Sequence, residues 1–377
     1  MEPECINLSR VRTFLSEYPL LRKVEKVVDH GIHVYPDPEY QKNPYEPLRP
    51  QEKKLMSCLC KNALKMHEKG KILIFQLKDL TSSQLRHISC NASFWVPKVD
   101  SDDGRICVDP SNRSDGRMPL NGGLAKILVI AKYGRVECPL MVDIVVDWIL
   151  YKEGSGLEWS KCCLAKEDCK TYFNQFKFHP KSCLHMCRRV SEEIIIVELF
   201  GNYGHTALPS ASQVVGKAME WTLRNSSSFL SVKCPLHLFF DDFMMMGSYI
   251  HCFEASQYTQ LLIKNVLGPG GHAANKSCFS QSEVILGYLI NMLDPRGASI
   301  GPKQEAVEKM LHLFFNFNPT FRQTLHFWQV IVWLILFIKP FPYYNQLPST
   351  TVNYSTLMSL LPLYTSLPSS TYIDLTY

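Results

Sequence analysis

The sequence has no long hydrophobic run and no export signal. Its longest apolar run is Ile331–Ile338; extended back to Phe327 it is interrupted by Gln329, and it falls short of the roughly 20 residues that span a bilayer. The N-terminal residues MEPECINLSR contain no basic start followed by an apolar core, so they do not resemble a secretory signal. We therefore expect an intracellular protein, cytoplasmic or nuclear, without membrane contact, in which the apolar run forms a buried helix.

Cysteine is abundant, but the paired spacing of zinc sites is absent. The chain has 14 cysteines, and without an export signal we expect them to be reduced thiols. One cluster lacks the matched cysteine pairs of a zinc finger and is interpreted as isolated thiols: Cys162, Cys163, Cys169, His179, Cys183, His185 and Cys187. The flanking sequence does not support a cysteine nucleophile paired with His179 or His205 either.

Other common signatures are missing as well. Gly268–Gly271 lacks the Gly-Lys-Ser/Thr ending of a phosphate-binding loop, and we expect a turn there. We find no internal repeat and no acidic set typical of a ribonuclease H or an integrase. Helices alternate with antiparallel hairpins, which indicates an α+β fold rather than a parallel doubly wound sheet.

Length, composition and charge set broad limits. The chain has 377 residues, 46% hydrophobic and 20% charged, so it can bury a large core and form two or three domains. Its 40 basic and 35 acidic residues give a net charge of +5. That balance permits binding to a nucleic-acid backbone without requiring it.

Hydrophobic periodicity and turn residues predict the main elements. We expect helices over Asn7–Val28, Gln51–Lys69, Ser210–Arg224, His251–Leu267 and Pro302–Phe317. We expect a strand over Ile194–Phe200, apolar elements over Ala125–Ala131 and Pro139–Leu150, a hairpin over Val96–Asp109, and a strand pair or a strand and turn over Ser282–Asn291.

Two adjacent aspartates, Asp241 and Asp242, follow the apolar run Leu236–Phe240 and precede Phe243–Gly247. This pattern predicts a β-hairpin with two carboxylates at its tip. Charge beside buried strands is costly unless a cation or a partner compensates it, and Mg²⁺ prefers such oxygen ligands. From this pair alone, an ordinary acidic turn is the simpler alternative. The methionines Met244–Met246 are expected to be strand core.

Four more short motifs accompany the aspartate pair. They are Val96-Pro97-Lys98 with Gly104-Arg105; Asp168-Cys169-Lys170-Thr171-Tyr172-Phe173-Asn174-Gln175; Tyr203-Gly204 with Pro209 and Gln213; and Asn275-Lys276-Ser277 with Leu286-Gly287. From about Phe94 to about Phe317, the five motifs in this order resemble those of the reverse transcriptases of retroelements. Each motif is weak alone, but five in the correct order with workable spacing are a strong signal.

The resemblance looks closest to retrotransposon enzymes of the long-terminal-repeat or tyrosine-recombinase type. It implies a right-hand polymerase fold with fingers, a palm whose antiparallel sheet packs on helices, and a partial thumb. The expected parts are an N-terminal extension (1–50), fingers with supporting helices (51–160), a palm (161–291) with part of the fingers inserted at about 176–208, a thumb or connection (292–340), and a low-order tail (341–377).

The resemblance also implies the chemistry, which is transfer of deoxynucleotides to a primer 3′-hydroxyl on an RNA or DNA template. Asp168 and Asp241 would bind two Mg²⁺ ions, with Mn²⁺ as an alternative, and the backbone carbonyl of Cys169 would bind one of them. Asp242 would support the site. Two divalent ions about 4 Å apart can activate the attacking oxygen and neutralise the leaving pyrophosphate.

Further roles follow from the same resemblance. Lys98 and Arg105 would hold the triphosphate of the incoming deoxynucleotide, since a cationic pair can clamp several negative charges. Phe173 would lie under the sugar and exclude a 2′-hydroxyl, and Lys276 would approach the leaving group. Solvated surface cations and core packing remain the alternatives for Lys98, Arg105 and Phe173.

The remaining motif residues would support template and primer. The Tyr203-Gly204 loop would lie beneath the template base and the nascent pair, with Pro209 and Gln213 on the helix that follows. Leu286 and Gly287 would grip the primer end. The family often has Phe where Ser212 stands, and this departure predicts weaker packing under the loop.

Two other functions stay open at this point. One is a decayed or truncated retroelement copy that binds nucleic acid without polymerising. The other is an interaction protein without nucleotide chemistry, which predicts that Asp168 and Asp241 lie far apart. The sequence does not indicate an oligomeric state.

Overall fold

The computed structural model describes residues 5–46, 56–97, 104–112, 118–227, 232–293 and 298–302, together with Glu305 and Glu308. The chain divides into two compact units, Met1–Gly301 and Pro302–Tyr377. The predicted thumb residues beyond Pro302, the apolar run Ile331–Ile338 and the tail from 341 therefore lie outside the described residues, apart from the helical Glu305 and Glu308.

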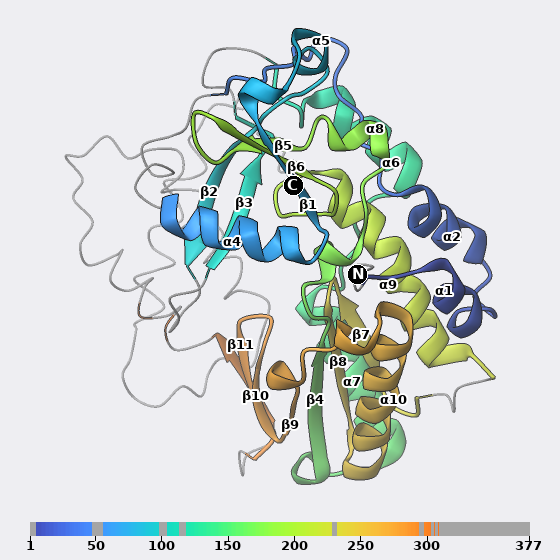
Figure 1. Cartoon of the computed structure of the whole chain (residues 1–377). Helices are drawn as coiled ribbons and strands as arrows, with labels where there is room; N and C mark the ends of the chain where they lie inside the picture. Colours follow the sequence, from blue (N-terminus) through green and yellow to red (C-terminus); the bar gives the residue numbers. More distant parts are fainter. Residues whose placement is uncertain are drawn as a thin grey trace, which may run out of the picture. The chain divides into compact units, whose positions relative to one another are not determined.

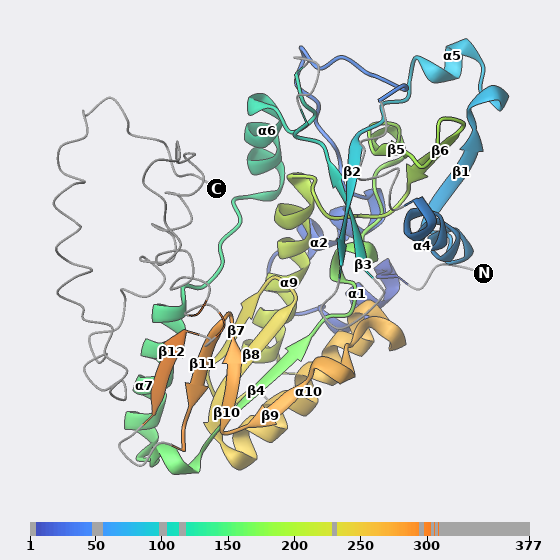
Figure 2. The ribbon, with the colours of Figure 1, turned by 90° about the vertical axis from the view of Figure 1, so that its left-hand side faces the viewer.

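The first unit is built around a four-stranded antiparallel sheet with the strand order β7-β8-β4-β9. These strands are β4 (Cys162–Asp168), β7 (Leu236–Phe239), β8 (Asp242–Ser248) and β9 (Cys278–Ser280). Figure 2 shows β7, β8 and β4 between helices α7 (Met141–Ser155) and α10 (Tyr249–Leu267). Helix α9 (Ala207–Asn225) packs against β7 and α10.

Side chains alternate across this sheet, as the pleat of a strand requires. Ala165, Phe243 and Met245 belong to the main hydrophobic core, which also contains buried residues of α9 and α10. Met244, Met245 and Met246 are all fully buried, so the methionine run is strand core as predicted. The sheet is therefore covered well enough to hold its strand ends rigidly.

Three smaller sheets complete the strands that the structure describes (Figure 1; β12 is labelled in Figure 2). Their strands are β1 (Ile72–Gln76), β6 (Ile194–Glu198) and β5 (Cys187–Arg189) in the first; β2 (Ala92–Pro97) and β3 (Gly104–Asp109) in the second; and β10 (Ser282–Ile285), β11 (Tyr288–Asn291) and β12 (Ser299–Pro302) in the third. The predicted hairpin over Val96–Asp109 corresponds to β2–β3, and the predicted strand pair or strand and turn over Ser282–Asn291 corresponds to the hairpin β10–β11.

The remaining helices lie mostly in the N-terminal part of the first unit. They are α1 (Leu8–Phe14), α2 (Leu21–His30), α4 (Met56–Glu68), α5 (Ser82–Leu85), α6 (Gly123–Tyr133) and α8 (Pro180–Cys183). Short 3₁₀ turns include η3 (Tyr172–Gln175), η4 (Pro269–Gly271) and η5 (Ala274–Lys276).

One helix prediction is wrong. The stretch Asn7–Val28 forms two helices, α1 and α2, separated at residues 15–20. Pro19 lies in this break, where it disfavours a helical residue before it and lacks the N–H that a continuous helix would use. The other helices with described residues match their predictions within a few residues, except that Pro302 ends β12 instead of starting a helix.

Two general expectations can be compared with the structure. No helix among the described residues is sufficiently long and apolar to span a bilayer. All 14 cysteines are free. Burial raises the pKa of the Cys169 and Cys187 thiols well above the usual range, so these sulfurs stay protonated.

Candidate functional site

Three aspartates converge where β4 and β8 meet. Asp168 ends β4 and pairs directly with Asp242, which begins β8. Asp241 lies in the turn before β8, and its carbonyl accepts a hydrogen bond of 2.8 Å from the backbone N–H of Cys169. The prediction of the non-enzymatic alternative, that Asp168 and Asp241 lie far apart, is therefore wrong.

The turn that carries Asp241 is strained. Phe239 pairs with Asp242, so Phe240 and Asp241 alone connect β7 to β8. Phe240 has φ of +54°, a left-handed conformation that is rare for a bulky side chain and costs of order 1–3 kcal/mol. Such strain persists only where surrounding structure enforces it, and it is common at functional sites.

Each of the two paired aspartates has one bonded and one unbonded oxygen. Asp168 Oδ2 lies 2.6 Å from Lys276 Nζ, and Asp242 Oδ2 lies 3.3 Å from Lys166 Nζ. The other oxygen of each carboxylate is buried and has no hydrogen-bond partner. A buried acceptor without a partner costs about 1–3 kcal/mol, so both oxygens are poised to take a cation.

The electrostatics of the site reflect this crowding of negative charge. Burial, the largest cause, and the neighbouring carboxylates of Asp241 and Asp168 together raise the pKa of Asp242 to about 6, against the opposing charge of Lys166. A positive charge beside Asp242 would therefore lower the electrostatic free energy of the folded site.

The donor set fits a hard divalent ion. Its atoms are carboxylate oxygens, the ligands that Mg²⁺ prefers, and two of them are buried without a partner. In the described part of the chain, no group of three or more His, Cys, Asp or Glu side chains is already arranged around a metal position. Bound ions would therefore draw the aspartates together and compete with the contacts from Lys276 and Lys166.

The predicted triphosphate clamp is only partly described. Arg105 pairs through its backbone with Val96 in the β2–β3 hairpin, and nothing is described of its side chain. Lys98 lies outside the described residues. The assignment of this cationic pair stays a prediction.

The predicted sugar gate lies beside the aspartates in a cluster of rings. Phe173 belongs to η3 rather than to a strand, directly after the β4 end. Its ring centroid lies 5.3 Å from that of Tyr203 and 6.3 Å from that of Phe240, both in edge-on geometry. Phe173 is partly buried, so packing and substrate contact are both compatible with its position.

The loop before α9 closely approaches the backbone of β3. Tyr203 accepts a hydrogen bond of 2.9 Å at its carbonyl from the N–H of Val108 in β3. Gly204 has φ of +118°, and an added Cβ would lie 1.8 Å from the carbonyl oxygen of Val108. Only glycine fits at this position.

The predicted template-support residues are anchored inside the protein. Pro209 lies in the first turn of α9, where a missing N–H is tolerated, as predicted. The side-chain amide of Gln213 both donates to the carbonyl and accepts from the N–H of Glu137, at 2.6 and 2.9 Å. Gln213 therefore fixes the segment between α6 and α7.

Ser212 is fully buried, with its hydroxyl bonded to the carbonyl of Pro209 at 3.1 Å. The hydroxyl of the buried Tyr172 donates to the Ser212 carbonyl at 2.8 Å. This contact ties η3, next to Asp168, to α9. The small side chain at 212 thus has its polar group satisfied and lies beside a large aromatic residue.

Lys276, Leu286 and Gly287 lie on the far side of β4 from β8. Lys276 belongs to η5 and reaches Asp168, as described above. Leu286 and Gly287 form the two-residue turn between β10 and β11, with φ of +49° and +84°. Two positive φ values match a type I′ turn, the kind that suits the twist of a hairpin.

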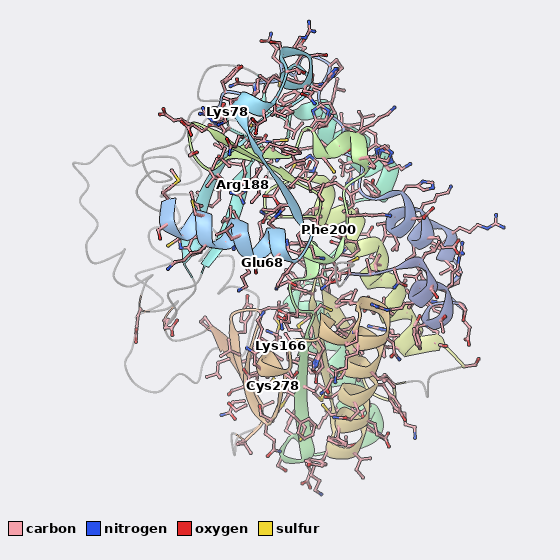
Figure 3. All side chains as sticks on the ribbon, viewed as in Figure 1. Glu68, Lys78, Lys166, Arg188, Phe200 and Cys278 are labelled. Carbon is pink, nitrogen blue, oxygen red and sulfur yellow. The ribbon has the colours of Figure 1, made fainter. Side chains whose placement is uncertain are left out.

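Sequence reasoning missed two residues of this site. Lys166 lies two residues before Asp168, and the strand alternation of period two could have placed both on one face. Figure 3 shows Lys166 beside Cys278 of β9, its partner in register. Glu167 points the other way and is fully buried; its partners are distant in sequence, so no local pattern revealed them.

Comparisons with known proteins support the fold. No family model matches the chain, and no curated protein matches it. Among solved structures, the foamy viral protease-reverse transcriptase dRH in complex with double-stranded DNA matches with a TM-score of 0.52 and 14% identity over 95% of this chain. A second structure of the foamy viral protease-reverse transcriptase with double-stranded DNA has a TM-score of 0.48 and 13% identity over 96% of this chain.

The chain spans 55% of the length of the first of these structures. At this identity, the likeness concerns the fold alone. The chain therefore has a mixed α+β fold of the reverse-transcriptase kind, with its three clustered aspartates at the end of β4 and the start of β8.

Proposed function

We propose that this chain is an RNA-directed DNA polymerase that adds deoxynucleotides to a primer 3′-hydroxyl. The observation that carries the proposal is the direct pairing of Asp168 with Asp242 next to Asp241, in a fold of the reverse-transcriptase kind. The structural neighbour with a TM-score of 0.52, which is in complex with double-stranded DNA, supports nucleic acid as the partner. Retrotransposon origin, of the long-terminal-repeat or tyrosine-recombinase type, remains part of this proposal.

In this mechanism Asp168 and Asp241 would hold two Mg²⁺ ions, with the Cys169 carbonyl as a further ligand. When bound, these ions supply an activated primer oxygen and charge neutralisation at the pyrophosphate. Asp242 would support the site beside them, where its buried oxygen without a partner and its negative charge would attract the ions. The rigid sheet keeps these groups in place, and positioning of this kind supplies much of the rate of phosphoryl transfer.

Other residues of the chain act on the nucleotide. Phe173 packs beneath the sugar, supported by Tyr203 and Phe240. Lys276 lies at the edge of the site, with 46% of its side chain exposed, so it can leave Asp168 and donate to a phosphate oxygen. Template pairing reads the sequence, so the protein itself needs contacts to backbone and shape.

The second candidate is an inactive copy that binds nucleic acid. The observation in its favour is that both paired aspartates already contact a lysine, Lys276 for Asp168 and Lys166 for Asp242. A polymerase must release at least the first of these contacts when metal binds. The two functions differ in one measurable property, which is primer extension.

The test is Mg²⁺-dependent primer extension on an RNA template by the parent protein and by Asp241→Asn. The proposal expects extension by the parent and its loss, by more than about 100-fold, in the variant. Asp29→Asn is the matched control, because that carboxylate is 57% exposed on α2. An inactive parent would favour the second candidate, whereas extension by Asp241→Asn at the parent rate would remove the proposed site.

A further inference from the structure

Next to the aspartates lies a buried carboxylate that the mechanism above does not use. Glu167 precedes Asp168 in β4, and its side chain is 1% exposed. Neighbouring residues of a strand point to opposite faces, so Glu167 points away from the three aspartates and toward α10. A buried carboxyl group requires hydrogen bonds that compensate its removal from water.

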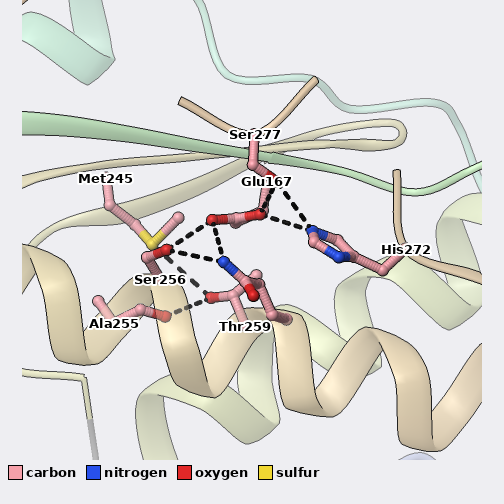
Figure 4. A network of polar contacts seen from close by, with 8 residues as sticks. Glu167, Met245, Ala255, Ser256, Thr259, His272 and Ser277 are labelled. Carbon is pink, nitrogen blue, oxygen red and sulfur yellow. Dashed lines mark hydrogen bonds and ion pairs between the residues drawn. The ribbon is translucent and has the colours of Figure 1, made fainter. Parts of the chain in front are cut away.

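Four side chains donate to this carboxylate (Figure 4). Oε1 accepts from Ser256 Oγ at 2.5 Å and from Gln260 Nε2 at 3.0 Å, both on α10. Oε2 lies 2.7 Å from His272 Nε2 and accepts from Ser277 Oγ at 2.5 Å. One oxygen therefore binds the helix, and the other binds the segment that carries Lys276.

The segment bound by Oε2 is a bulge in the sheet. Lys166 pairs with Cys278, and Cys169 forms a bridge with His272. Between these pairings, β4 has only residues 167–168, while the opposite chain has residues 273–277. The additional residues fold into the turn η5, which places Lys276 Nζ at Asp168.

Glu167 holds the two ends of this bulge. His272 stands at its beginning and Ser277 at its end, and both contact the same oxygen. His272 Nε2 and Ser277 Oγ also lie 3.0 Å apart, which closes the three groups into one network. Fixing both ends leaves the intervening turn few conformations, so the position of Lys276 depends on Glu167.

We propose that Glu167, through His272 and Ser277, is the positioning residue that sets Lys276 against Asp168 and the incoming triphosphate. This inference rests on the proposed polymerase function for its kinetic consequence, while its structural consequence is independent of it. The class of ligand that Lys276 would meet is a nucleoside triphosphate, recognised by its phosphate charge.

The two serines offer a matched pair of variants. Ser277→Ala removes a donor on the bulge side of Glu167, and Ser256→Ala removes the equivalent donor on the α10 side, where Gln260 still donates to the same oxygen. Both variants delete one hydroxyl that lies 2.5 Å from the same carboxylate. Only the first loosens the end of the bulge.

The first measurement is amide hydrogen exchange of the folded protein without nucleotide. Ser277→Ala should speed exchange at Ala273 and Lys276, whose N–H groups bond Asp168 and Ala273, by about 10-fold or more. Ser256→Ala should leave these two amides at the parent rate. Equal exchange in the two variants would overturn the proposal, whether or not the chain polymerises.

The second measurement is single-nucleotide incorporation in a double-mutant cycle. Ser277→Ala should lower the rate at saturating nucleotide by roughly 10-fold, because small displacements of a catalytic group are costly. In a Lys276→Ala background, the same change should have no further effect, since it acts through that lysine. Equal losses in both backgrounds would show a purely structural role and overturn the proposal; a parent without activity would instead contradict the proposed function.

Discussion

At the scale of single residues, the site depends on oxygen atoms that lack partners. Asp168 and Asp242 each keep one buried oxygen without a hydrogen bond, although a lysine contacts the other. Burial and the adjacent carboxylates raise the pKa of Asp242 to about 6. Burying these carboxylate oxygens without partners costs free energy, and such an arrangement is expected where a bound cation compensates the negative charge.

The ring of Phe173 leads to a prediction at the same scale. Phe173→Ala should let ribonucleotides enter, because removing the ring opens space beneath the sugar next to Tyr203 and Phe240. We expect the preference for deoxynucleotides to fall by roughly 10- to 100-fold. Single-nucleotide incorporation with paired deoxy- and ribonucleotides measures it, and an unchanged preference would contradict the gate assignment.

At the scale of elements, the turns of both hairpins at the site contain a residue that is unusual for its backbone conformation. Phe240 and Leu286 each occupy a left-handed position that favours glycine or asparagine. The backbone is therefore strained at both residues. The resemblance assigns Leu286 to the primer end, which would give that strain a function.

Leu286→Asn should stabilise the protein by about 1 kcal/mol, because asparagine tolerates positive φ in a type I′ turn. It should also weaken primer binding if Leu286 contacts the primer end, as the resemblance implies. Denaturant unfolding and primer titration measure the two effects. Gly287→Ala is the matched control, expected to destabilise the same turn at φ of +84°. Lower stability in Leu286→Asn would contradict the strain argument.

The sequence was informative about the elements and less so about the contacts between them. Apolar runs and turn residues predicted the hairpin that carries Asp241 and a strand pair or strand and turn around Leu286, and the resemblance in motif order implied that Asp168 would meet the Asp241 hairpin. Local pattern did not predict the Glu167 network, because His272 and Ser277 are 105 and 110 residues away. The helix prediction also did not take account of Pro19, which disfavours a helical residue before it and separates α1 from α2.

At the scale of the molecule, buried histidines make stability depend on pH. Burial lowers the pKa of His205 from 6.5 to about 3, so this ring stays neutral in the folded protein. Its Nδ1 accepts a hydrogen bond from the N–H of Ala207, which requires the neutral form. In the unfolded chain the ring gains a proton below pH 6.5, so stability is complete above that pH and is lost as pH falls toward 3.

His205→Asn should remove this part of the pH dependence, because an amide oxygen can accept the same hydrogen bond and does not titrate. The parent should lose about 2 kcal/mol more than the variant between pH 6.5 and pH 5. Denaturant unfolding of both proteins at the two pH values measures this difference in stability. The same pH dependence in both proteins would show that other groups govern acid stability.

The central claim is that carboxylates from distant segments of the chain share divalent ions. Titration of Mn²⁺, followed by electron paramagnetic resonance in the presence of primer, template and nucleotide, tests it most directly. Bound Mn²⁺ is expected in the parent protein and in Asp29→Asn, and its loss is expected in Asp168→Asn. Equal binding by Asp168→Asn and the parent would contradict it.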